Sequence, residues 1–221
     1  PKRLDIIDNA DDPRYNISGA HDVKVRYVSG IGMVAYVVSI WSNAISTFNV
    51  NDPGNILFLG SYQDTDVLNG AFILVVDGGY AYVTSYYSNT IAVINVNDPR
   101  NISLASYVDL GSVNVGSDCY PKNALYVLKE GNLLYVSSEI ICYMANDSKK
   151  SGGGISIFEI SFSSMSLTYK GGSYGHGDPD NSRGIWTFGK QGNYIYAPEI
   201  SGTLHVLDVS DPGNIVEWTT I

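Results

Sequence analysis

The loop 175–181, with the sequence GHGDPDN, gathers residue types that can bind a metal ion. Asp178 and Asp180 offer carboxylate oxygens suited to Ca²⁺, and the imidazole of His176 suits a transition metal. The spacing does not match that of an EF-hand, and Gly, Asp, Pro and Asn are also ordinary turn residues. A metal site and a plain turn both remain open. No metal or cofactor is assigned, and the three residues are kept as candidate ligand-binding residues.

Other candidate chemistry is weaker. The stretch 63–66, QDTD, offers oxygens in the same way, with the same alternative of turn chemistry. His21, His176 and His205 are scattered, and their spacing supports no Ser-His-Asp arrangement. Gly152–Gly154 follows two lysines, but no helix pattern follows it, as a phosphate cradle would need. The sequence therefore predicts no catalytic residue and a protein that is not an enzyme.

An internal repeat dominates the chain. The motif NVNDPGN at 49–55 returns as NVNDPRN at 95–101 and as DVSDPGN at 208–214. Segments 32–62 and 78–108 superpose without a gap at an offset of 46 residues, and 192–221 follows the same pattern with one deletion. Segment 131–174 is a degenerate unit with an insertion, and 4–18 matches the second half of a unit. Such periodicity is typical of repeat architectures.

Each unit contains four short runs with period-2 alternation, which we name a to d and interpret as strands. Glycine-containing pairs, such as Gly78-Gly79, favour a hairpin between a and b. The Asp-Pro turn joins c to d, because Asp accepts nearby backbone N–H groups and Pro fixes φ. No segment shows a helical stripe. We therefore predict an all-β fold, a β-propeller of four-stranded antiparallel blades.

The prediction is one repeat domain over 1–221, with four full blades plus a half blade. The half blade covers 4–19, and the full units cover 20–63, 70–108, 120–174 and 182–221. The chain begins at Pro1, as a processed chain or a fragment would. An open arc exposes strand edges and apolar blade faces. We therefore favour a partial ring, from a fragment or an assembly subunit, over a closed four-bladed ring.

The repeat resembles the LVIVD-repeat β-propellers. The resemblance is carried by Ala35-Tyr36-Val37 with Asp52-Pro53, and by Ala81-Tyr82-Val83 with Asp98-Pro99. The amino-acid sequence of strand b in the second unit is similar also to that of YVTN-type surface propellers. These resemblances imply an exported or cell-surface protein, and they bring no shared catalytic residues.

The long irregular loops leave the blades on one side, through the b–c and d–a connections, and long loops on a rigid scaffold often bind ligands. Neutral drift at tolerant sites is the alternative. Trp41 and Tyr87 lie near b–c loops and are candidate sugar-stacking residues. The tyrosine column is expected to pack between blades instead; it comprises Tyr36, Tyr82, Tyr135 and Tyr196.

Cys119 and Cys142 lie on the same long-loop side. They are equidistant from a hairpin centred at Glu130-Gly131, so we predict that they face each other and form a disulfide. Two separate buried thiols are the alternative. A strict two-residue hairpin would make them a hydrogen-bonded pair, so a bulge or slight offset is expected. Zinc needs four ligands, which two cysteines without a nearby histidine do not supply.

Composition narrows the partners. The 221 residues carry 13 basic and 22 acidic side chains, for a net charge of -9. The sequence has no cluster of Lys and Arg that could bind phosphates, so nucleic acid is not expected as a partner. No run approaches the roughly 20 apolar residues of a membrane helix, so membrane insertion is not expected. Sequons at Asn16, Asn101 and Asn146 favour a glycosylated extracellular or cell-surface protein.

These observations predict a non-catalytic extracellular scaffold that mediates adhesion or assembly through contacts with other protein subunits, including self-assembly. The first alternative is a module that binds a carbohydrate or small ligand on the long-loop face. The second is a metal-dependent hydrolase or lactonase-like propeller, because propellers can host metal-dependent chemistry on their axis.

Overall fold

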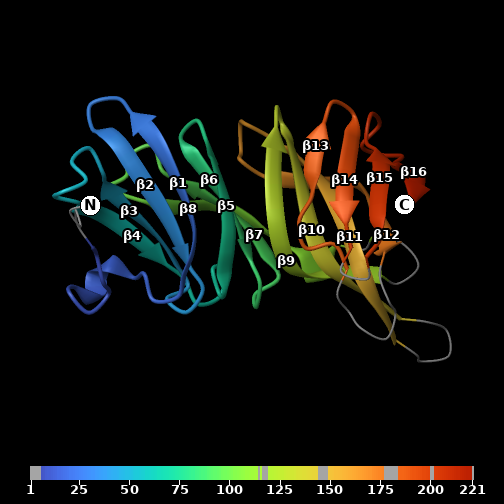
Figure 1. The fold of residues 1–221 in the computed structure, drawn as a ribbon, viewed down its shortest axis with the longest axis horizontal. Coiled ribbons are helices and arrows are strands. Elements are labelled where there is room, and N and C mark those ends of the chain that lie inside the picture. Colours follow the sequence, from blue (N-terminus) through green and yellow to red (C-terminus); the bar gives the residue numbers. More distant parts are fainter. Residues whose placement is uncertain are drawn as a thin grey trace. The chain divides into compact units, whose positions relative to one another are not determined.

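In a computed structural model, the described part of the protein forms four antiparallel sheets of four strands each (Figure 1). The structure describes residues 6–113, 115, 119–143, 149–176, 184–199 and 202–220. Every sheet is a meander in which the strands follow in chain order. The predicted propeller blades are confirmed. We name the sheets blades 1 to 4.

Blades 1 and 2 cover the first half of the chain. Blade 1 comprises β1 (Ala20–Val28), β2 (Gly32–Ser39), β3 (Ala44–Asn49) and β4 (Leu57–Gln63). Blade 2 comprises β5 (Ala71–Asp77), β6 (Tyr80–Ser85), β7 (Thr90–Asn95) and β8 (Ser103–Asp109). The short 3-10 helices η1 (Pro13–Tyr15) and η2 (Leu110–Ser112) flank these strands.

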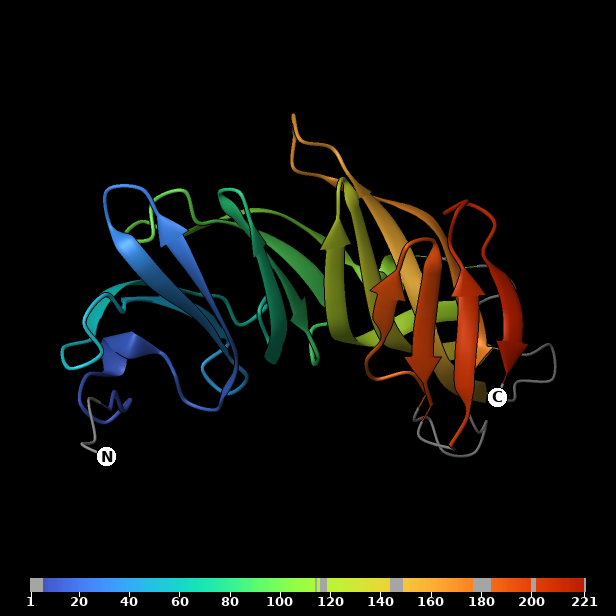
Figure 2. The same cartoon turned by 45° about the horizontal axis from the view of Figure 1, so that its top comes forward.

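Blades 3 and 4 cover the second half, and their order can be followed from yellow to red in Figure 2. Blade 3 comprises β9 (Cys119–Glu130), β10 (Leu133–Tyr143), β11 (Lys149–Ile160) and β12 (Leu167–His176). Blade 4 comprises β13 (Gly189–Gln191), β14 (Tyr194–Pro198), β15 (Leu204–Asp208) and β16 (Val216–Thr220). The chain forms two compact units, Pro1–Tyr107 and Val108–Ile221, and each is considered by itself.

The repeated turn has the same geometry wherever its sequence occurs. In blade 1 the carboxylate of Asp52 accepts the Gly54 N–H at 2.8 Å, and its carbonyl accepts the Asn55 N–H at 3.0 Å. Asp98 and Asp211 make the equivalent pairs of bonds in blades 2 and 4. This Asp-Pro turn recurs because side chain and backbone satisfy each other locally.

The turns also join consecutive blades within each unit. In the first unit, the hydroxyl of Thr47 on β3 donates to the carbonyl of Pro99 in blade 2 at 2.6 Å. In the second, Gly171 on β12 lies against the turn of blade 4, where a Cβ would stand 2.2 Å from the Pro212 carbonyl oxygen. A blade thus receives the Asp-Pro turn of the next blade on its own third and fourth strands.

Apolar side chains on both faces of the central strands form the core between blades. All residues of β7 except the last are buried, whichever face they occupy. A cluster that includes Tyr36, Ile45, Leu74 and Ile94 joins blades 1 and 2. A second cluster, with Tyr135, Ile157 and Leu207, joins blades 3 and 4. The tyrosine column therefore packs mostly as expected, although Tyr196 is 39% exposed.

The predicted half blade at 4–19 forms no strand in its described part, residues 6–19. Its Asp12-Pro13-Arg14 turn does form, because Arg14 N–H donates to the Asp12 carboxylate at 2.9 Å. The segment lies on blade 1: Ser46 donates its hydroxyl hydrogen to the Tyr15 carbonyl at 2.6 Å. The half-repeat sequence encodes the turn, but the strand needs a sheet neighbour that the segment does not have.

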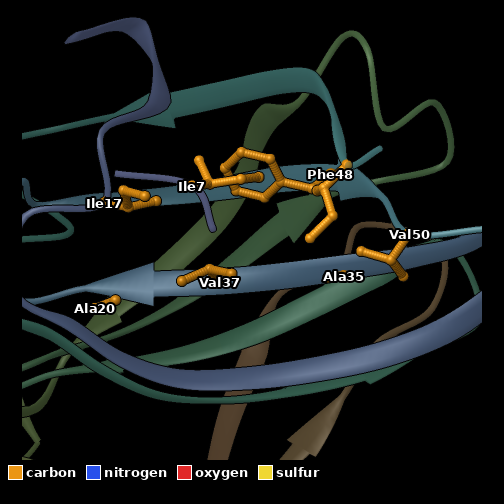
Figure 3. Close-up of a pocket in the computed structure, with 8 residues that line it drawn as sticks. Ile7, Ile17, Ala20, Ala35, Val37, Phe48 and Val50 are labelled. Carbon is orange, nitrogen blue, oxygen red and sulfur yellow. The ribbon is translucent and has the colours of Figure 1, made fainter. Parts of the chain in front are cut away.

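A hollow of about 230 Å³ remains between this segment and blade 1 (Figure 3). Ile7 and Ile17 of the segment face Ala35 and Val37 of β2 and Phe48 of β3 across it. The lining is apolar, so the hollow offers no group for acid-base chemistry.

Among the described residues, no helix has the length and apolar character needed to cross a membrane.

Candidate functional site

Blade 4 holds an imidazole between two carboxylates. The Nε2 atom of His205 lies 2.9 Å from Glu199 Oε2, and its Nδ1 atom lies 2.7 Å from Glu217 Oε1. His205 is on β15, Glu217 on the adjacent β16, and Glu199 directly after β14. The side chains of His205 and Glu199 are 8% and 5% exposed, whereas that of Glu217 is 36% exposed. The trio, which we call the Glu-His-Glu site, therefore opens to solvent at Glu217.

The geometry favours a charged imidazole. A neutral ring has one N–H and can satisfy one carboxylate, whereas the imidazolium donates to both. Burial, the largest influence, opposes protonation, but the hydrogen bonds to Glu199 and Glu217 outweigh it and raise the pKa of His205. The site therefore holds a proton close to a carboxylate that solvent can reach.

The fourth blade departs from the repeat at the positions that form this site. Glu199 follows the paired residue Ala197 by two positions, as Ser39, Ser85 and Ser138 follow the equivalent paired residues of the other blades. Those three serines are buried, and their hydroxyls have no hydrogen-bond partner within the described structure. His205 aligns in the same way with Ser46, Ala92 and Ser156. Blade 4 thus has an ionisable pair where the other three blades have small residues. Since those blades form the same fold, the fold itself does not require the pair.

The arrangement suits proton transfer more than metal binding. Both ring nitrogens of His205 already face carboxylate oxygens, so neither offers a lone pair to an ion. Within the described residues, no cluster of three or more His, Cys, Asp or Glu side chains is arranged to hold a metal ion. A carboxylate-imidazole pair that shares a proton is a common general acid-base device.

A polar hollow of about 400 Å³ lies among the β9–β10, β13–β14 and β15–β16 turns of blades 3 and 4. Lys190 projects into it, pairs with Glu130 and lies 5.1 Å from the centre of the Tyr135 ring. Its ammonium also donates to the Gly192 carbonyl at 2.5 Å. The lysine is thus committed to structural contacts, and we place no chemistry there.

The residues predicted from sequence lie elsewhere. Trp41 and Tyr87 are 73% and 57% exposed, as a stacking role requires. His176 is the last residue of β12, where its backbone pairs with Gly153. Asp178 and Asp180 lie outside the described residues, so the metal interpretation of their loop stays a prediction.

The weaker candidate at 63–66 has a structural explanation. One carboxylate oxygen of Asp64 accepts the N–H groups of Asp66 and Val67 at 2.9 and 2.8 Å. The bond from Val67 is the main cause of the lowered pKa of Asp64. The carboxylate therefore closes a turn, as the alternative interpretation proposed.

The backbone register places Cys119 directly opposite Cys142 on β9 and β10. The pair Glu130–Leu133 closes the hairpin, so its turn is centred at Gly131-Asn132, one residue later than the predicted centre at Glu130-Gly131. Register shifts at Ser137/Ser138 and Ser138/Glu139 restore the alignment, which agrees with the expected bulge. The disulfide bond itself stays a prediction.

The sequons differ in their surroundings. Asn101 is exposed in the turn after β7. Asn16 is partly buried, and its side-chain amide donates to the Ser61 hydroxyl at 3.0 Å. Asn146 lies outside the described residues. Glycosylation stays a prediction, and of the two described sequons Asn101 is the more accessible.

No protein-family model matches the chain, and no curated protein matches it. Its resemblance to the LVIVD-repeat propellers therefore stays a prediction. Solved structures do match its fold. One is provisionally named a 6-phosphogluconolactonase from Bacteroides uniformis, with TM-score 0.66 and 16% identity over 91% of this chain and 54% of the other.

Two further matches carry related names. A Bacteroides fragilis protein, also provisionally named a 6-phosphogluconolactonase, has TM-score 0.62 and 17% identity over 91% of this chain and 54% of the other. The periplasmic gluconolactonase of Pseudomonas aeruginosa has TM-score 0.66 and 14% identity over 91% and 53%. The chain thus spans about half the length of these structures, and at this identity the likeness shows the fold.

These matches correct the functional prediction. The non-catalytic adhesion scaffold, and with it the expectation that the protein is not an enzyme, is overturned because similar structures are named as lactonases. The lactonase-like alternative agrees better with them. Sequence reasoning missed Glu199 and Glu217 and gave His205 no catalytic role. The available signal was a histidine in a column of small residues.

Proposed function

We propose that the protein hydrolyses a lactone of a sugar acid, with the Glu-His-Glu site of blade 4 as its acid-base device. The proposal is carried by His205, which lies within hydrogen-bond distance of both a buried and an accessible carboxylate. The names of the similar structures supply the reaction class. Because both ring nitrogens of His205 face carboxylate oxygens, we assign acid-base chemistry to the site.

The reaction adds water to the ring carbonyl carbon and breaks the bond between that carbon and the ring oxygen. Glu217, the most exposed member, accepts a proton from the attacking water. The imidazolium of His205 gives the Nδ1 proton that it shares with Glu217 to the leaving ring oxygen, which becomes a hydroxyl group, and Glu217 then passes the water proton to the imidazole. Glu199 contacts no substrate in this scheme: it is a positioning residue that holds the imidazole and favours its charged form.

The test is hydrolysis of glucono-1,5-lactone and its 6-phosphate, followed by acid release and corrected for spontaneous opening. His205→Asn should lower kcat/KM by roughly 10²- to 10⁴-fold, the usual contribution of a general acid-base group. Glu159→Gln is the control, because the Glu159 carboxylate on β11 pairs with Lys170 outside the Glu-His-Glu site and its loss should leave kcat/KM unchanged. Hydrolysis at the spontaneous rate by the wild-type protein would refute the proposal, as would equal effects of both variants.

We further propose that the protein is exported, on the basis of its sequons and of the register of Cys119 and Cys142. Oxidising compartments favour disulfides. Reduction of the purified protein should add about two mass units, the two hydrogens of the opened bridge. An unchanged mass after complete reduction would remove the disulfide and weaken the case for export.

A further inference from the structure

Trp41 and Tyr87 occupy equivalent places in blades 1 and 2. The residue before Trp41, Ile40, donates its N–H to the Gly19 carbonyl at 3.0 Å. The residue before Tyr87, Tyr86, donates to the Gly70 carbonyl at 2.9 Å. Each aromatic residue therefore stands at the start of a b–c turn, beside the segment that enters the first strand of its own blade.

A glycine supports each ring. A Cβ at Gly19 would stand 2.9 Å from Trp41 Cδ2, and one at Gly70 would stand 2.6 Å from Tyr87 Cδ2. Any larger residue would push the rings away, so both are seated on bare backbone. Since Trp41 is still 73% and Tyr87 57% exposed, the remaining surface of each ring faces water.

Further aromatic residues extend from Tyr87 across the seam to blade 1, where His21 follows the glycine under Trp41. His21, two residues after Gly19, stacks on Phe72 with ring centres 3.8 Å apart. Phe72 lies 6.0 Å from Tyr86, and Tyr86 meets Tyr87 edge to face at 5.2 Å. These five residues, which we call the aromatic patch, are His21, Trp41, Phe72, Tyr86 and Tyr87.

Polar groups border the patch. Asn43, in the turn that follows Trp41, accepts the Gly70 N–H on its side-chain oxygen at 3.0 Å, which ties the glycine under Tyr87 to the turn that carries Trp41. The Asp64 N–H donates to the Asn43 carbonyl at 3.0 Å, and the two residues that follow Asp64, Thr65 and Asp66, are exposed. These side chains can exchange hydrogen bonds with hydroxyl groups, and the carboxylate, on a chain of net charge -9, disfavours an anionic ligand.

We propose that the aromatic patch binds a neutral glycan, with Trp41 and Tyr87 stacking on the apolar faces of two sugar rings. Preset aromatic rings cost little conformational entropy on binding, and their polar border suits a ligand with apolar faces and hydroxyl edges. The glycan site lies in the first unit and does not rest on the lactone hydrolysis proposed for blade 4.

The experiment titrates the protein with uncharged pentasaccharides of glucose, mannose, galactose and N-acetylglucosamine, followed by amide NMR shifts. At least one series should shift the signals of the patch. Trp41→Ala and Tyr87→Ala should each weaken its binding by roughly 2- to 12-fold, the range for one aromatic contact. Trp41→Phe keeps a ring and should restore most of the affinity.

Two control variants match the exposure of the tested residues. Tyr27 on β1 is 73% exposed and Tyr107 on β8 is 54% exposed, and neither belongs to the patch. Tyr27→Ala and Tyr107→Ala should leave the affinity unchanged, and so should His205→Asn. The proposal is overturned if no pentasaccharide binds, or if the patch instead binds choline, a cation that aromatic rings also recognise. It is also overturned if the control variants weaken binding as much as Trp41→Ala does.

Discussion

Substituting Gly171 by alanine tests how consecutive blades fit together. The glycine lies in β12 of blade 3, under the Asp-Pro turn of blade 4. Its added Cβ would stand 2.2 Å from the Pro212 carbonyl oxygen, and real Cβ contacts essentially never fall below 3.0 Å. The obstacle is backbone rather than a flexible side chain, so the turn itself must move.

The magnitude follows from two opposing effects. Overpacking of this kind costs about 1–3 kcal/mol. Gly→Ala also restricts the unfolded chain, which returns about 0.4–1 kcal/mol. Gly189→Ala is the matched control, because Gly189 lies in β13 of the same unit and its Cβ would have no neighbour within 4 Å. That variant should keep the gain alone, which leaves the two variants about 1–3 kcal/mol apart.

Urea unfolding followed by tryptophan fluorescence gives the comparison, since Trp186 and Trp218 both lie in this unit. Gly171→Ala should lower the free energy of unfolding, and Gly189→Ala should maintain or raise it, with m-values unchanged. Equal free energies for the two variants would refute the view that the turn of each blade is fitted to the strand of the one before.

Two further predictions concern a buried hydroxyl and a buried histidine. Thr47→Val should lower the free energy of unfolding by about 1–3 kcal/mol, because it removes the hydroxyl that donates to the buried Pro99 carbonyl. Thr65→Val, in an exposed turn, should have little effect. Urea titration of both variants measures the difference. The pKa of His205, measured by its NMR signals, should exceed the ordinary value and fall in Glu217→Gln. Because the folded-state pKa of His205 is raised, the stabilisation from this site is present below about pH 6.5 and is lost as the pH rises through the folded-state pKa. A difference in unfolding free energy between wild type and Glu217→Gln that does not change with pH would contradict this.

The propeller blades were predictable because their signals are local. An Asp-Pro turn satisfies its own backbone, so Asp52, Asp98 and Asp211 reveal their structure within a few residues. The strand register that places Cys119 opposite Cys142 was also predictable, although two register shifts compensated for a misplaced hairpin centre. The half blade was wrong as a strand because strand formation depends on a neighbour, which residues 6–19 do not show.

The Glu-His-Glu site could not be predicted in the same way. Glu199, His205 and Glu217 come from the end of one strand and from two others, and only the strand register brings them together. Sequence reasoning sought chemistry in long loops, whereas this site replaces small buried residues inside a repeat. Column-by-column comparison of blades, with attention to ionisable residues among small ones, would have found His205.

The proposed hydrolysis is tested most directly by the pH dependence of kcat/KM for glucono-1,5-lactone in the wild-type protein and in Glu217→Gln. Glu217 is the accessible proton acceptor in this account. The wild-type profile should therefore show an acidic limb from a carboxylate, and Glu217→Gln should lose it together with roughly 10²-fold or more of the rate. A variant with the wild-type rate and profile would contradict the assignment of the chemistry to blade 4.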